Sequence, residues 1–182
     1  MDDYPEHLAP EFDEGGAPAT PFEDWWARVQ DCFPTVPEDV ARYWLYEHWR
    51  HSPFSFLRSR DYAFEAQDWA PDRVREIKSR WCDYDERHEG CRAQGEYILK
   101  LSGYRTRTHM LAHGVPPARL IVLDNWDSHL VEGRGRVPEY ENLPTGYVLI
   151  EGHRRFNMCL ALHARDQLKL LPIWLMKRVA SL

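Results

Sequence analysis

Apolar positions in the first quarter of the chain repeat at the spacing of a helix. Over residues 22–33 they recur every three to four residues, which predicts an amphipathic helix. A second helix is predicted to begin at Pro37, because a proline followed by two acidic residues is typical of a helix start, and to run toward Trp49. Together these segments predict a helical hairpin over residues 22–51.

The middle of the chain changes period and then changes back. Aromatic and polar residues alternate over residues 53–66, which favours an extended ribbon. Helices are predicted over residues 72–81, 96–101 and 105–113, and Gly114 ends the third one.

The last third of the chain reads as strand, loop, strand, turn, helix and strand. Short apolar runs at residues 120–123, 147–150 and 171–176 predict the strands. The connection over residues 125–145 is rich in glycine and proline, and we expect it to form a lid or rim loop. The predicted fold class is α+β (or α/β), with a small mixed β-sheet, flanking helices and an N-terminal helical appendage.

Charge divides the chain into unequal parts. Residues 1–24 contain eight acidic residues and no lysine or arginine, whereas the whole chain has a net charge of −6. Residues 1–21 also hold four prolines and a glycine pair, and we expect an acidic, disordered leader there. The predicted organisation is therefore leader 1–21, helical hairpin 22–51 and sheet domain 52–182.

The segment from Glu151 to Asn157 is the strongest candidate site. It places Gly152, His153, Arg154 and Arg155 at a turn from a strand into a helix. Arginines are disfavoured at a helix N-terminus, which is the positive end of the helix dipole, unless an anion lies among them. The pattern therefore indicates a phosphate site, and the alternative is two solvated surface arginines.

Several neighbouring polar residues could complete such a site. Glu151 could hold Mg²⁺, act as a base or pair with an arginine, and His153 could transfer a proton. Asn157 could donate to phosphate. Asp124 and Asn125 follow the strand at 120–123, and polar residues at the carboxyl end of a strand often line a cleft.

The segment 152–158, Gly-His-Arg-Arg-Phe-Asn-Met, resembles the glycine–x–x–arginine signature of the ParB/sulfiredoxin superfamily. The similarity extends over residues 105–178 and includes the proline turn before the strand at 120–123. Met158 stands where ParB proteins usually have alanine. His153 stands where sulfiredoxins have their reactive cysteine, so sulfinic acid reduction is not expected.

This resemblance implies a nucleotide ligand, either ATP or CTP, bound with Mg²⁺ at Gly152–Asn157. From their positions in the sequence, Asp124 and Asn125 are further candidates for this site, Glu151 and His153 are candidate catalytic residues for slow hydrolysis or phosphotransfer, and Glu151 is the candidate Mg²⁺ ligand. The chain lacks the helix-turn-helix of ParB proteins, and it is similar in this respect to plasmid fertility-inhibition proteins of the oncogenic-suppression type. Proteins of that type act in DNA transfer or plasmid and phage competition.

Two other functions stay open at this stage. One is a non-enzymatic inhibitor that docks on a protein partner through the aromatic N-terminal helices. The other is a metal-dependent DNase, for which the basic half of the chain, with Arg134, Arg136, Arg154 and Arg155, would bind DNA.

The four cysteines are scattered and include no Cys-x-x-Cys pair, so the sequence predicts neither a disulfide framework nor a redox dithiol. Cys82, His88 and Cys91, with His109 or His113, form a less favoured zinc alternative. No apolar run is long enough to cross a membrane, and we expect no membrane partner and a cytoplasmic location.

Overall fold

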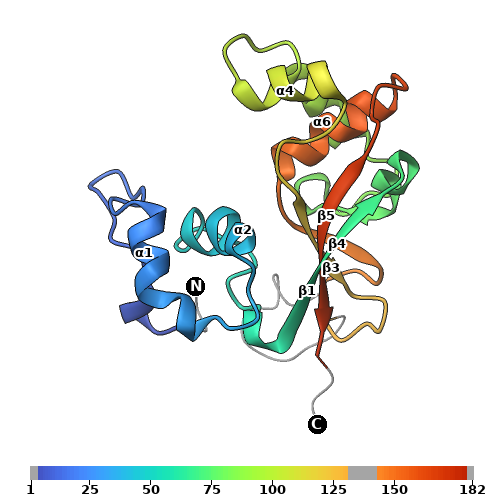
Figure 1. Ribbon diagram of the computed structural model, residues 1–182. Helices are drawn as coiled ribbons and strands as arrows, with labels where there is room; N and C mark the ends of the chain where they lie inside the picture. The colour runs from blue at the N-terminus through green and yellow to red at the C-terminus, as the bar shows by residue number, and fades with distance from the viewer. Residues whose placement is uncertain (1–3, 131–142, 180–182) are drawn as a thin grey trace. The chain divides into compact units, whose positions relative to one another are not determined.

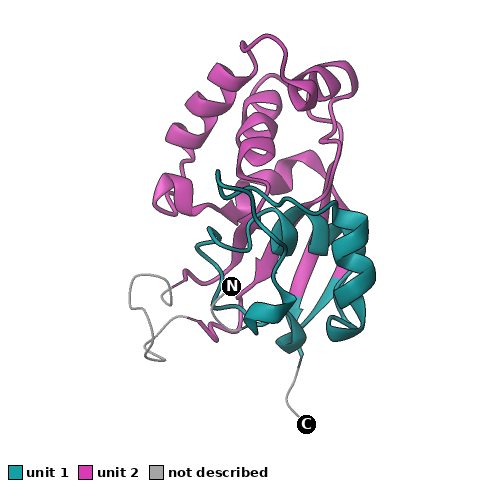
Figure 2. Ribbon diagram, turned by 90° about the vertical axis from the view of Figure 1, so that its left-hand side faces the viewer, with its two compact units in different colours: residues 1–64, 177–182 teal, residues 65–176 magenta. Residues whose placement is uncertain are grey.

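The computed structural model describes residues 4–130 and 143–179. The chain divides into two compact units, which Figure 2 shows in separate colours. Unit 1 contains residues 1–64 and 177–182, and unit 2 contains residues 65–176.

Unit 1 is mainly helical. Its elements are η1 (Glu6–Leu8), α1 (Phe22–Val29), η2 (Gln30–Cys32), α2 (Glu38–Val40), the π-helix η3 (Ala41–Tyr46) and η4 (Ser59–Asp61). Both helical segments that the sequence predicts are present. The second is shorter than expected, because the chain leaves helical geometry after Tyr46.

Aromatic residues of unit 1 form its own core. Trp25 and Trp44 are fully buried, and the Trp25 indole donates a hydrogen bond to the Leu8 carbonyl at 2.8 Å. Trp26 and Tyr43 are half-buried. Internal packing therefore accounts for most of the aromatic content that suggested a docking surface.

The leader has a defined path over the part that the structure describes. The sequence predicts disorder for residues 1–21, whereas residues 4–21 contain the turn η1 and a β-bridge between Phe12 and Pro18. Leu8 is buried. The difference has a physical cause, because Leu8 is buried and its carbonyl accepts the hydrogen bond of the Trp25 indole.

Unit 2 holds most of a mixed sheet and the helices around it. Its elements are η5 (Pro71–Glu76), β2 (Ile77–Lys78), η6 (Arg80–Cys82), α3 (Glu89–Ile98), α4 (Arg105–His113), β3 (Leu120–Asp124), β4 (Tyr147–Glu151) and α6 (His153–His163). The strands β1 (Tyr62–Trp69) and β5 (Leu171–Arg178) lie mostly in unit 2, and each has residues in unit 1.

The sheet has five strands in the order β1-β5-β3-β4-β2. Figure 1 labels β1, β3, β4 and β5. β3 runs antiparallel to β4 and parallel to β5, and β2 runs parallel to β4. The central strands β3 and β4 are almost wholly buried, as their continuous apolar runs predict. The molecule is therefore of the mixed α+β class, with the small mixed sheet that the sequence predicts.

The helix α6 is the centre of the unit 2 core. Residues 156–162 are all buried, and the helix packs closely on α3. Gly95 makes this approach possible, because a Cβ atom there would lie 1.9 Å from the Asn157 carbonyl oxygen. The position of α6 is thus set by backbone contact with α3, which holds its first turn in place.

Two secondary-structure predictions for unit 2 are wrong in detail. The helix expected over residues 72–81 is a 3-10 turn, the short strand β2 and a second 3-10 turn. Pairing of Ile77 with Tyr147 draws this segment into the sheet, against its local helical pattern. The helix expected at 96–101 instead spans Glu89–Ile98. The helix at 105–113 has the predicted bounds, with Gly114 in a left-handed conformation after it.

Candidate functional site at the carboxyl end of β4

Gly152 makes the turn from β4 into α6. Its φ of +97° lies in the left-handed region, and it occupies the position before the first helical residue. A Cβ atom there would lie 2.6 Å from a methyl carbon of Leu120. The turn therefore requires glycine both for its conformation and for its packing, as the strand-to-helix pattern predicts.

Glu151 caps this turn. Its Oε1 atom accepts a hydrogen bond of 2.6 Å from the Gly152 backbone N–H. The carboxylate is half-buried and lies at the positive end of the α6 dipole, where a negative charge is favourable. This contact gives Glu151 a structural function at the turn.

His153 contacts an exposed tryptophan. The imidazole is buried and stacks on the Trp81 indole with 4.7 Å between ring centroids and 24° between ring planes. Trp81 is 49% exposed. It belongs to η6, which follows β2, and β2 runs parallel to β4. The carboxyl ends of two parallel strands thus bring Trp81 and His153 to one edge of the sheet, where ligands of α/β proteins often bind.

The two arginines of the signature differ in position. Arg155 is half-buried, and its Nε and Nη2 atoms lie 3.3 Å from where a Gly152 Cβ would be. Its guanidinium therefore folds back over the turn. Arg154 is exposed. We refer to Trp81, Gly152, His153, Arg154 and Arg155 as the carboxyl-end site.

Asn157 belongs to the helix interface. It is fully buried, and its Nδ2 atom donates to Gln94 Oε1 on α3 at 3.1 Å. The sequence predicts Asn157 as a phosphate ligand, whereas the structure directs its side chain toward α3. The reason is that Asn157 lies on the side of α6 that packs on α3, and a contact between two helices cannot be predicted from the local sequence.

Asp124 and Asn125 lie at the opposite end of the strand pair. β3 and β4 are antiparallel, with Ile121 opposite Glu151 and Asp124 opposite Tyr147. The carboxyl ends of the two strands therefore point to opposite edges of the sheet. The expectation that Asp124 and Asn125 share a site with Gly152 is wrong for this reason.

Asn125 uses its side chain to hold the loop that joins β3 to β4. Its Nδ2 atom donates to the carbonyls of Pro144 and Leu143 at 3.1 and 3.4 Å. Its Oδ1 atom accepts from the Leu130 N–H at 3.3 Å. Most of the predicted lid, with Arg134 and Arg136, lies outside the described residues.

A disulfide joins Cys82 to Cys91, with 5.8 Å between their Cα atoms. The sequence prediction of no disulfide is wrong. The spacing of the two cysteines matches no motif, and it is the fold that brings η6 against the first turns of α3. The zinc alternative also fails for these two residues, because disulfide sulfurs are not thiolate ligands. The bond fixes the residue next to Trp81 to a helix of the core.

Trp81 is the member of the carboxyl-end site that sequence reasoning missed. One feature of the sequence could have indicated Trp81, because a large aromatic residue stands there between Arg80 and a charged loop. With eight tryptophans in the chain, however, packing in the core is the expected role of each one. The parallel pairing of β2 with β4 is what brings Trp81 to His153, and a two-residue strand leaves too short a pattern to detect.

Within residues 4–130 and 143–179, no three or more histidine, cysteine, aspartate or glutamate side chains gather closely enough to hold a metal ion. In the same ranges, no helix has both the length and the apolar character to cross a bilayer.

Comparisons with protein-family models, with curated proteins and with solved structures found no match to this chain. Function is therefore inferred from the geometry of the carboxyl-end site.

Proposed function

We propose that the protein binds a nucleotide at the carboxyl-end site. The observation that carries this proposal is the stacked pair of Trp81 and His153 beside two arginines at the N-terminus of α6. An aromatic face and a cationic helix start are complementary to the two parts of a nucleotide, the base and the phosphates.

The phosphates would lie over the Gly152 turn. The α6 dipole and the backbone N–H groups of its first turn favour an anion there. Arg155 already folds over the turn, and the exposed Arg154 adds a second guanidinium that can reach outward.

The base would stack on Trp81. One face of the indole contacts His153, and about half of the side chain is exposed. Stacking of a base on an aromatic ring contributes about 1–3 kcal/mol and discriminates little between bases. ATP and CTP therefore stay equal candidates.

The resemblance to the ParB/sulfiredoxin superfamily supports the same proposal. Gly152 lies between β4 and α6, and the remaining residues of the signature segment form the first turns of α6. We propose on this basis a ParB/sulfiredoxin-like domain in which Arg155 is the main phosphate ligand. Asn157, Asp124 and Asn125 are left out of the proposed site because they lie elsewhere.

Binding is better supported than turnover. Glu151 is the carboxylate nearest the turn, and its hydrogen bond to the Gly152 N–H competes with a role as base or Mg²⁺ ligand. A magnesium ion that enters with a nucleotide can be held largely by phosphates and water, with one carboxylate or none. Hydrolysis is therefore a separate outcome of the experiment below.

The test uses tryptophan fluorescence and calorimetry with each of ATP, CTP, GTP and UTP in the presence of Mg²⁺. We expect saturable binding, a loss of roughly tenfold in affinity for Arg155→Ala, and quenching that Trp81→Phe removes. Trp126→Phe is the matched control, because Trp126 is also exposed, at 60%, but lies beyond the opposite end of β4.

Two results would overturn the proposal. One is that no nucleotide binds, and the other is that Arg155→Ala binds as wild type does. Quenching that depends on Trp126 and not on Trp81 would place the ligand at the wrong end. Release of phosphate that Glu151→Gln abolishes would add hydrolysis to binding. A short DNA oligonucleotide that competes for the same arginines would favour the DNA-binding alternative.

A further inference from the structure

Two exposed histidines lie one turn apart at the end of α4. His109 and His113 are at positions i and i+4, and their ring centroids are 4.5 Å apart with 47° between the planes. Residues at this spacing project from the same face of a helix. No hydrogen bond or ion pair to either imidazole is found within residues 4–130 and 143–179.

The helix holds this pair in a defined geometry. Met110, between the two histidines, is completely buried and fixes which side of α4 faces the core. Gly114 ends the helix in a left-handed conformation, and its N–H donates to the Met110 carbonyl at 2.8 Å. The last two turns are therefore regular up to His113.

We propose that His109 and His113 form a bidentate site for a divalent cation of the Zn²⁺ class. Neutral imidazole is a favoured ligand of Zn²⁺, Ni²⁺ and Cu²⁺. Two imidazoles on successive turns present two nitrogens to one ion, and water or a group from another molecule completes the coordination.

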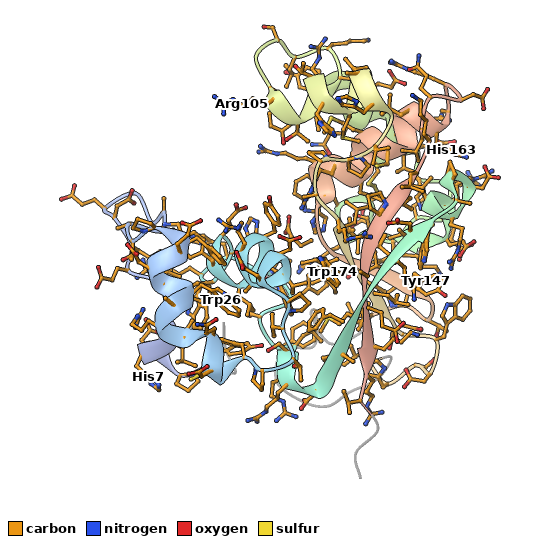
Figure 3. The ribbon with its side chains drawn as sticks, viewed as in Figure 1. His7, Trp26, Arg105, Tyr147, His163 and Trp174 are labelled. Atoms are coloured by element: carbon orange, nitrogen blue, oxygen red, sulfur yellow. A yellow bond between two sulfur atoms is a disulfide. The ribbon has the colours of Figure 1, made fainter. Side chains whose placement is uncertain are left out.

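The dipole of α4 favours a cation at this end of the helix, because His113 belongs to the last turn, where the dipole is negative. The stem of Lys169 packs at Gly114, directly after His113, and brings one positive charge to the same region. Arg105 projects from the first turn, at the far end of the helix (Figure 3). This site is independent of the proposed nucleotide site, since none of its residues belongs to the carboxyl-end site.

The experiment is a titration of the full-length protein with ZnCl₂ or NiCl₂, without a histidine tag and in the Cys32→Ser background, because Cys32 is an exposed thiol that would also bind metal. We expect one site per chain, and each of His109→Gln and His113→Gln should weaken binding by about tenfold or more, because the second ligand acts at high effective concentration. His7→Gln is the matched control, as His7 is exposed in unit 1.

A Cu²⁺ absorption band gives a second measurement that does not depend on stability. The band of a two-imidazole complex should be present in the parent protein and absent in both single variants. Equal affinities for the parent and the His113→Gln protein would overturn the proposal, as would a loss of binding in His7→Gln. Circular dichroism of each variant separates loss of a ligand from loss of the fold.

Discussion

The two ends of β4 share two features and differ in their polar contacts. Each has a glycine with positive φ, Gly146 at +111° and Gly152 at +97°. Each also has an exposed tryptophan nearby, Trp126 at one end and Trp81 at the other. The polar groups at the Gly146 end bond to one another, whereas the Gly152 end gathers cations.

The difference follows from how each end is connected. At the Gly146 end the chain returns from β3 to β4, and Asn125 closes the connection with side-chain hydrogen bonds to both sides of it. Trp126 packs edge-on against Tyr147 at 5.9 Å and lies 3.8 Å from where a Gly146 Cβ would be. At the Gly152 end a helix begins, and a helix start has unpaired donors. Polar residues after a strand can therefore hold a connection together, as Asn125 does, instead of forming a site.

Loss of the Asn125 side chain should have the largest effect on stability. Asn125→Ala removes three hydrogen bonds from a fully buried position and leaves buried carbonyl groups without donors. The expected loss in unfolding free energy is about 2–4 kcal/mol, measured by urea denaturation. Nucleotide binding, measured at a temperature about 20 °C below the melting temperature of the variant, should be unchanged.

Asp124→Ala is the control for this change. Asp124 is half-buried, and its Oδ1 atom accepts one hydrogen bond of 3.2 Å from the Trp126 N–H. We expect a loss of about 1 kcal/mol or less. If Asn125→Ala abolished nucleotide binding in a folded protein, the two ends would be coupled and the comparison would fail.

The two glycines allow a matched test of the ends. Gly152→Ala and Gly146→Ala both place a side chain at positive φ, which costs roughly 1–3 kcal/mol. Only at Gly152 would the new methyl group lie 3.3 Å from the Arg155 guanidinium, and so only Gly152→Ala should also weaken nucleotide binding. At Gly146 the nearest atoms belong to Trp126 and are at ordinary contact distance.

Calorimetry on both glycine variants, at a temperature where each is folded, separates the two effects. A Gly146→Ala protein that bound nucleotide as weakly as Gly152→Ala would show that backbone strain acts through the whole strand. The expected pattern is a larger loss of stability for Gly152→Ala, whose methyl group would also lie 2.6 Å from Leu120, and a loss of affinity for Gly152→Ala alone.

Local signals in the sequence predicted the elements of the site better than their arrangement. The turn at Gly152 and the helix after it follow from a glycine between an apolar run and helix formers, and α4 ends at Gly114 as predicted. The direction of β3 relative to β4 depends on pairing between distant residues. This is why Asp124 was placed at the wrong edge.

The Cys82–Cys91 disulfide and the contact of Trp81 with His153 could not be predicted from the sequence for the same reason, because they also depend on pairing between distant residues. The strand β2 has only two residues, and its parallel pairing with β4 is what brings the η6 turn to the start of α6. The sequence therefore locates the part of the site at the start of α6, whereas the part at η6 is found only from the fold.

The last prediction concerns Cys159, a buried residue of α6 whose pKa is affected by Arg155 of the carboxyl-end site. Burial raises the pKa of this thiol from its ordinary value of 9.0 to about 12, and the charge of Arg155, one turn earlier in α6, acts in the opposite direction. Because the pKa is raised in the folded state, the neutral thiol contributes stability fully below pH 9, and this contribution is lost as the pH rises from 9 toward 12. Cys159→Ala should therefore lose stability less steeply than wild type between pH 8 and pH 10.5 in urea denaturation, by at most about 1.4 kcal/mol per pH unit.

Arg155→Leu removes the opposing charge, raises the pKa of Cys159 further and should leave the wild-type slope at least as steep. If Cys159→Ala and wild type lost stability in parallel over this range, the thiol would not be held neutral, and the turn that carries Arg155 would be more open to water than its burial indicates.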